Sequence, residues 1–264
     1  KTGGPYADTV KEDARADYYI LMQDTATLDN ADSLIAEMKR FAIKQITLHH
    51  NTHYRQGDFT PIKSAFPDGA SDVKAVVDKF HENGIKVILD GVFNHTGRGF
   101  FAFRDLKENR ENSRYRNWYC NVNFWGNNSY NDGFSYENWG GYDLLAKLNQ
   151  HNPAVKDYIC DVIRFWVKEF DIDGIRLDAA DVMDFDYMKA LRQVANEVKS
   201  DFWLMGEVIH GDYSRWANAD TLHSVTNYTL HKALFSGHND RNYFEITHTI
   251  KRNIEMCEEK LKNK

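Results

Sequence analysis

Short apolar runs alternate with longer amphipathic stretches along most of this 264-residue chain, and this alternation constrains the fold more than any other feature. Short apolar runs are typical of buried parallel strands, and the amphipathic stretches between them are typical of helices that cover a sheet. The sequence therefore predicts an α/β fold built from repeated strand-helix units. We expect strands at residues 18–22, 45–49, 86–92, 174–179, 203–208 and, more weakly, 222–227, and helices at residues 31–41, 71–83, 152–170 and 185–199.

Residues 97–150 interrupt this rhythm, because they are dense in Asn, Gly, Tyr and Trp and show little periodicity. A connection of this length is too long for an ordinary loop, so we interpret it as a functional insertion after the third strand. The chain is accordingly divided into a strand-helix domain, residues 1–96 and 151–264, and an insertion sub-domain, residues 97–150. Three tryptophans of the insertion, Trp118, Trp125 and Trp139, either line a cleft or fill the core of the sub-domain.

Three of the predicted strands end in ionisable residues, and the carboxyl ends of parallel strands lie on one face of a barrel. Asp90 ends the apolar run IKVILD, and Glu207 follows the apolar run WLMG. Arg176 and Asp178 alternate with apolar residues in GIRLDAAD, so a strand periodicity of two puts both side chains on the same side. Any one of these residues could form a strand-end salt bridge, but the three motifs together predict a shared site.

Two carboxylates of this predicted site, Asp178 and Glu207, can carry its chemistry. On adjacent barrel strands they can approach to about 5 Å, the separation that retaining glycosidases use. We expect Arg176 to hold Asp178 ionised as a nucleophile. We expect burial to raise the pKa of Glu207, so that this side chain keeps a proton to donate.

The motifs ILDGVFNH, GIRLDAAD and GEVIHG resemble, in order, the first three sequence signatures of the alpha-amylase family of glycoside hydrolases, in particular its neopullulanase-like and maltogenic-amylase-like members. DLLAKLNQHNP resembles the short motif that this family carries late in its insertion. The resemblance covers roughly residues 84–245. It implies a (β/α)8-type TIM barrel, incomplete in this chain with about six strands, and an insertion sub-domain after the third strand.

The resemblance also implies a two-step retaining mechanism on α-glucans, with Asp178 as nucleophile and Glu207 as acid/base. Asp90 and His95 are implied to grip the reacting glucose, and His210 to contact the leaving side. No cofactor is required, and Asn94 matches a position that often binds a structural calcium ion. The full set of residues implied to bind substrate is Arg176, which would also orient the nucleophile, Asp90, His95, His210 and Asp181.

The sequence departs from the family pattern after the sixth strand. We find no Asn-His-Asp motif ending a seventh strand, so the third carboxylate of the family is missing, and SGHNDRNYFE lacks a preceding apolar run. Residues 56–58 are Gln-Gly-Asp where the family has Gly-Tyr-Asp, which would remove a stacking ring. The loop histidines His49, His50 and His53 are interpreted as neighbours of a sugar pocket rather than as metal ligands.

An open barrel with six strands exposes two sheet edges, so either the chain is a fragment or a second chain or an oligomer covers these edges. Residues 247–264, with Ile250, Ile254 and Leu261 as apolar anchors, form either a capping helix or a docking site for another chain.

Charge and hydropathy exclude two classes of partner. The net charge is −6, and Lys and Arg are scattered among Asp and Glu, so the chain lacks the basic stripe that nucleic acid requires. No apolar run approaches the ~18 residues of a membrane span, and the first ten residues have no apolar signal core. We expect a soluble protein, either cytoplasmic or secreted with its signal removed. The three cysteines, widely spaced, predict unpaired thiols.

Two functions follow from these patterns. The first is a retaining glycoside hydrolase that acts on starch-like oligosaccharides through a covalent glycosyl-enzyme. The second is a catalytically incompetent fragment or engineered barrel that binds α-glucan or a partner chain without turnover. Hydrolysis, transglycosylation and isomerisation share the same two acids, and the sequence leaves the choice among them open.

Overall fold

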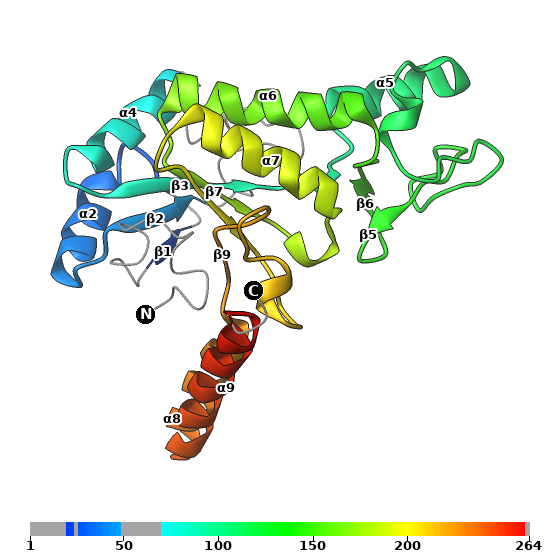
Figure 1. The fold of residues 1–264 in the computed structure, drawn as a ribbon. Coiled ribbons are helices and arrows are strands. Elements are labelled where there is room, and N and C mark those ends of the chain that lie inside the picture. Colours follow the sequence, from blue (N-terminus) through cyan, green and yellow to red (C-terminus); the bar gives the residue numbers. More distant parts are fainter. Residues whose placement is uncertain (1–19, 24–25, 49–69, 262–264) are drawn as a thin grey trace.

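The computed structural model describes residues 20–23, 26–48 and 70–261. In this part of the chain six parallel strands form one sheet, in the order β1-β2-β3-β7-β8-β9 (Figure 1). The expected partial barrel of about six strands is therefore confirmed, and the strand boundaries differ from the expected ones by at most two residues. The strands are β1 (Ile20–Gln23), β2 (Gln45–Leu48), β3 (Lys86–Gly91), β7 (Gly174–Leu177), β8 (Trp203–Gly206) and β9 (Ser224–Val225).

An α-helix lies between each two successive strands of this sheet from β1 to β8, as the periodicity predicts. The helix α6 (Pro153–Phe170) begins where the Asn152 side chain accepts a hydrogen bond from the amide of Ala154. Pro153 fits the first helical turn, where a missing N–H costs nothing. Figure 1 shows α6 lying beside α7 above the sheet. The remaining helices of this layer are α2 (Ala31–Arg40), α4 (Ala70–His81) and α7 (Phe185–Val198).

The core lies between these helices and the sheet. Leu89, Ile175 and Leu204 come from three adjacent strands and are fully buried. Trp166 of α6 and Phe80 of α4 are equally buried above them. Strands covered on their faces in this way need almost continuous apolar sequence, which explains why the strand runs were readable in the sequence.

The stretch at residues 97–150 is more regular than its composition suggests. It contains α5 (Phe101–Asn109), whose Ala102, Phe103 and Leu106 are buried. A second sheet has the order β4-β6-β5. The expectation that this stretch has little periodicity is therefore wrong for α5, while its assignment as a separate sub-domain stays a prediction. The strands of the second sheet are β4 (His95–Thr96), β5 (Asn138–Trp139) and β6 (Tyr142–Lys147).

Two helices, α8 (Tyr228–Asn239) and α9 (Tyr243–Leu261), pack on each other and project away from the sheet (Figure 1). Ile250 and Ile254 keep 43% and 50% of their surface exposed, so α9 does not bury the anchors that a capping helix needs. The side chain of Leu261 lies outside the described residues. The capping interpretation is thus unsupported, and the docking interpretation remains a prediction. No helix in the described ranges combines the length and apolar character needed to cross a membrane.

A buried carboxylate links four elements at the amino end of β7. Asp173 immediately precedes β7 and accepts hydrogen bonds from His81 Nε2 at 2.7 Å and from Lys199 at 2.9 Å. It also accepts from the backbone amide of Val87 at 2.8 Å. Burial opposes ionisation of this carboxyl, but these hydrogen bonds outweigh it and lower the pKa of Asp173.

Replacing Asp173 with Ala should therefore destabilise the fold by about 3 kcal/mol, because it removes one partner of a buried ionic network. Asp173 has a lowered pKa in the folded state, so its contribution is present above the unfolded pKa of about 4 and is lost as the pH falls through the lower folded value. Urea unfolding at pH 7 and at pH 3 measures both effects. Asp171→Ala is the matched control, since Asp171 also contacts Lys199 but is half exposed. Equal losses in the two variants, or a loss independent of pH, would contradict this account.

Candidate active site

Three adjacent strands bring the predicted acids to one place. Asp90 of β3 lies opposite Arg176 of β7 in the parallel register. The ladder continues past the strand ends, because the amide of Asp178 donates to the carbonyl of Gly91 and the amide of Glu207 donates to the carbonyl of Leu177. The side chains of Asp178 and Glu207 therefore emerge at the carboxyl edge of the sheet.

One guanidinium holds all three carboxylates of this edge. Arg176 Nη1 lies 2.5 Å from Asp90 Oδ1 and 3.2 Å from Asp178 Oδ1. Arg176 Nη2 lies 2.8 Å from Glu207 Oε2. Arg176 and Asp90 are almost fully buried, while Asp178 and Glu207 retain partial exposure. The structure thus brings together four of the predicted site residues, with the two proposed reacting acids on the accessible side.

Glu207 has two further partners. Its Oε1 atom accepts a hydrogen bond from the hydroxyl of Tyr228 at 2.6 Å, and its Oε2 atom accepts from the amide of Ala179 at 3.2 Å. Ala179 has a φ of 48°, an uncommon conformation for a residue with a side chain, and this turn aims its amide at Glu207. Tyr228 is the first residue of α8 and was not among the predicted site residues.

Gly206 explains how closely β8 can approach the turn after Asp178. A Cβ atom on Gly206 would lie 2.3 Å from Leu222 Cδ1 and 2.8 Å from Ala180 Cβ. No side chain fits there without a shift of the neighbours. The glycine before Glu207 is therefore required by packing, and it sets the position of the glutamate.

The expected order of the two pKa values is wrong. Burial raises the pKa of Asp178 to about 6, and the negative charge of Asp90 adds to the rise. Arg176 opposes this rise, but it divides its charge among three carboxylates. Burial also opposes ionisation of Glu207, yet the hydrogen bond from Tyr228 and the charge of Arg176 lower the pKa of Glu207.

This inversion determines where a shared proton resides. Between the two pKa values the pair of Asp178 and Glu207 holds one proton, and most of that proton is on Asp178. A smaller fraction of molecules carries it on Glu207. Only that fraction combines an ionised aspartate with a protonated glutamate.

The remaining predicted residues differ in their surroundings. His95 is buried on β4, and its ring stacks on Trp139 with 5.6 Å between centroids. Asp181 is half-buried in the short helix η4 (Ala180–Val182), and its amide donates to the carbonyl of Glu207. His210 is exposed in the segment after β8. The residues at 49, 50, 53 and 56–58 lie outside the described ranges.

Asn94, the predicted calcium ligand, takes part in a buried hydrogen bond. Its Oδ1 atom is buried and accepts a hydrogen bond from Gln150 Nε2 at 3.0 Å. Calcium needs six or more oxygen ligands, and no group of three or more His, Cys, Asp or Glu able to hold a metal occurs in the part of the chain that the structure describes. The possible calcium site at Asn94 therefore stays a prediction of the sequence.

The three tryptophans of the insertion were expected either to line a cleft or to fill a core, and they differ in burial. Trp118 packs in the core, whereas Trp125 is 98% exposed. Trp139 is partly exposed beside His95, where it can line the approach to the site.

Comparison with known proteins agrees with this geometry. The family profile described as "Alpha amylase, catalytic domain" matches residues 13–264. The chain belongs to the alpha-amylase family of glycoside hydrolases. The resemblance drawn from the sequence motifs is therefore confirmed.

Two curated members of the family are similar to this chain. A cyclomaltodextrinase of Thermoanaerobacter pseudethanolicus is 38% identical over 72% of this chain and 33% of its own length. Neopullulanase 2 of Thermoactinomyces vulgaris is 37% identical over 70% of this chain and 31% of its own length. The chain thus spans about a third of these curated relatives.

A solved structure gives the same fold. The debranching enzyme from Nostoc punctiforme superposes with a TM-score of 0.68 and 25% identity, covering 80% of this chain and 51% of that enzyme. The six-stranded sheet and its covering helices therefore correspond to part of an alpha-amylase-type barrel.

Proposed function

We propose that the protein hydrolyses α-linked glucans by a two-step retaining mechanism, with Asp178 as nucleophile and Glu207 as acid/base. The observation that carries this proposal is the single guanidinium of Arg176, which binds both carboxylates at the carboxyl edge of the sheet. The names of the family members similar to this chain support the choice of α-glucan as substrate. A second chain over the open sheet edges is part of the same proposal.

In the first step Asp178 attacks the anomeric carbon while Glu207 gives its proton to the glycosidic oxygen. The carbon–oxygen bond to the leaving sugar breaks, and an ester to Asp178 forms. In the second step Glu207 removes a proton from water, which attacks the same carbon and releases Asp178.

The charge of the site suits this reaction. One guanidinium faces three carboxyl groups, so the cluster carries excess negative charge once Asp178 ionises. The transition state has positive charge on the sugar ring and is stabilised by a fixed negative environment. Asp90, buried behind Arg176, contributes to that field and keeps Arg176 in place.

Release of reducing sugar from maltohexaose tests the proposal. Glu207→Gln should lower the rate at least ~1,000-fold, because the leaving oxygen then lacks its proton donor. The matched control is Glu197→Gln, an exposed glutamate on α7, which should retain the wild-type rate. If the wild type binds maltohexaose but releases no sugar, the protein is a glucan binder without turnover and the proposal fails.

The hydroxyl of Tyr228 should control the acidic side of the pH profile. The reactive form holds one proton, so kcat/KM should fall above the Asp178 value of about 6 and below the lowered pKa of Glu207. Removing the hydrogen bond in Tyr228→Phe lets the pKa of Glu207 rise, so the acidic limb should move to higher pH. The plateau should change by no more than ~100-fold, because a hydrogen bond to a charged group contributes about 1.5–3 kcal/mol.

Tyr213→Phe is the matched control for this experiment. The hydroxyl of Tyr213 accepts a hydrogen bond from the amide of Thr229 in α8, next to Tyr228, and so supports the same helix end. Its loss should leave the acidic limb in place. An unchanged limb in Tyr228→Phe, or equal shifts in both variants, would contradict the role given to Tyr228.

A further inference from the structure

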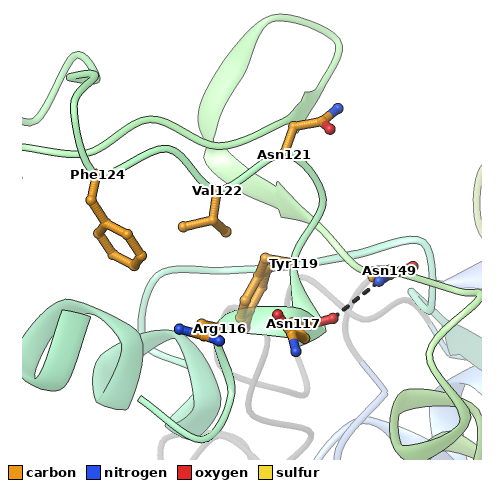
Figure 2. A pocket seen from close by; sticks show the side chains of 7 residues that line it. All are labelled: Arg116, Asn117, Tyr119, Asn121, Val122, Phe124 and Asn149. Atoms are coloured by element: carbon orange, nitrogen blue, oxygen red, sulfur yellow. Dashed lines mark hydrogen bonds between the residues drawn. The ribbon is translucent and has the colours of Figure 1, made fainter. Parts of the chain in front are cut away.

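A pocket of about 420 Å³ opens in residues 97–150, apart from the carboxylate cluster. Figure 2 shows it between the short helix η3 (Arg116–Trp118) and the segment that carries Val122 and Phe124. Its volume lies within the ~300–1,000 Å³ that ligand pockets usually have. Its lining includes none of the residues that contact Arg176.

The rim of this pocket is polar and carries no acid. The side chain of Asn117 is exposed and makes no hydrogen bond within the described residues. Asn149 donates from Nδ2 to the backbone carbonyl of Asn117 at 3.1 Å, and this bond fixes the side-chain amide of Asn149 at the rim (Figure 2). Arg116 supplies the only formal charge among the lining residues. Amides offer donors and acceptors together, so this rim suits a neutral ligand rich in hydroxyl groups.

The opposite wall is apolar. In Figure 2 the side chains of Val122 and Phe124 point from their segment toward η3. Tyr119 forms the base and is only 3% exposed. A ligand with one apolar face and a polar edge satisfies both walls, and a pyranose ring has that character. Trp125, next to Phe124 in the chain, adds a 98% exposed indole beside this segment.

The base of the pocket is joined to the strand that carries His95. The hydroxyl of Tyr119 is hydrogen-bonded to Thr96 Oγ1 at 2.9 Å, and Thr96 follows His95 in β4. Tyr119 also pairs with Leu148, which follows β6. The pocket is therefore built on the second sheet, whose strand β4 also carries His95.

We infer that this pocket is a second saccharide site, which binds one or two glucose units of an α-glucan away from the reacting carboxylates. The choice of glucose rests on the proposed function, whereas a neutral, hydroxylated ligand follows from the lining alone. A glucan held there would stay near the protein between rounds of cleavage at Asp178.

Titration of maltotriose into the Glu207→Gln variant tests this inference, because binding is then measured without turnover. In NMR spectra, backbone and side-chain amide resonances report binding at the carboxylate cluster and binding at the pocket separately. We expect shifts both at the cluster and at Asn117 and Phe124. Asn117→Ala and Phe124→Ala should each weaken the pocket site at least ~10-fold and leave the cluster site unchanged. The control Asn109→Ala, an exposed asparagine on α5, should change neither.

The outcomes separate this inference from the proposed function. Maltotriose shifts confined to the cluster, or pocket shifts that persist in Asn117→Ala, would overturn the second site. Pocket binding in a wild type that releases no reducing sugar would overturn only the proposed hydrolysis. Equal pocket binding of cellotriose would retain a saccharide site but overturn its α-glucan specificity. Asn117 is exposed, so its variant should fold even if Phe124→Ala does not.

Discussion

Replacing Asp178 with Asn should lower the hydrolysis of maltohexaose at least ~1,000-fold. The amide cannot form the ester with the anomeric carbon, so the first step loses its nucleophile while the proton donor remains. The volume of the side chain is unchanged, and Arg176 can still contact its oxygen. Initial rates of reducing-sugar release measure the loss, and maltotriose binding measured on the same variant should persist.

The matched control for this variant is Asp186→Asn. Asp186 lies on α7, the helix that follows the same strand, and its exposed carboxylate pairs with Lys189. This variant should keep the wild-type rate. A rate in Asp178→Asn within tenfold of the wild type would exclude Asp178 as the nucleophile.

Replacing Arg176 with Ala should destabilise the fold by about 3–5 kcal/mol and remove activity. The change leaves three carboxyl groups clustered at the edge of the sheet without their shared cation. Their mutual repulsion then favours protonation, so the destabilisation should shrink as the pH falls from 7 to 4. Thermal or urea unfolding over this pH range measures it.

Two further variants separate this effect from simple loss of packing. Arg164→Ala removes an exposed arginine that pairs with Glu197 and Asp161, and it should cost little stability. Adding Asp90→Asn to Arg176→Ala should recover part of the lost stability, because one buried charge is removed. No recovery, together with a loss independent of pH, would show that Arg176 acts through packing alone.

Much of the fold could be predicted because its strands are buried on their faces. In Lys86–Gly91 three apolar residues precede Asp90, in Gly174–Leu177 apolar residues flank Arg176, and Gly84, with a φ of 70°, marks the end of the preceding helix. The helix Phe101–Asn109 was missed because only Ala102, Phe103 and Leu106 mark its buried side within a stretch rich in asparagine and aromatic residues. Short helices with three buried residues give a weak periodic signal.

The site could be predicted by position but not by electrostatics. Motif and strand periodicity placed Asp90, Arg176, Asp178 and Glu207 together. The pKa order was wrong because the sequence shows only that Arg176 is two residues from Asp178, not that it is shared with two other carboxylates. Tyr228 gave no signal, since its hydrogen bond to a glutamate 21 positions earlier depends on where α8 begins.

The contact between β3 and β7 has a consequence for how the molecule folds. Asp90 and Arg176 are neighbours in the sheet but 86 positions apart in the chain, so pairing them closes a long loop that contains the whole second sheet. Loop closure costs entropy that is recovered only after the strands pair, and contacts of this range slow folding. We therefore expect the three carboxylates to meet late in folding, and shortening the stretch between the two strands should speed refolding while leaving the six-stranded sheet intact.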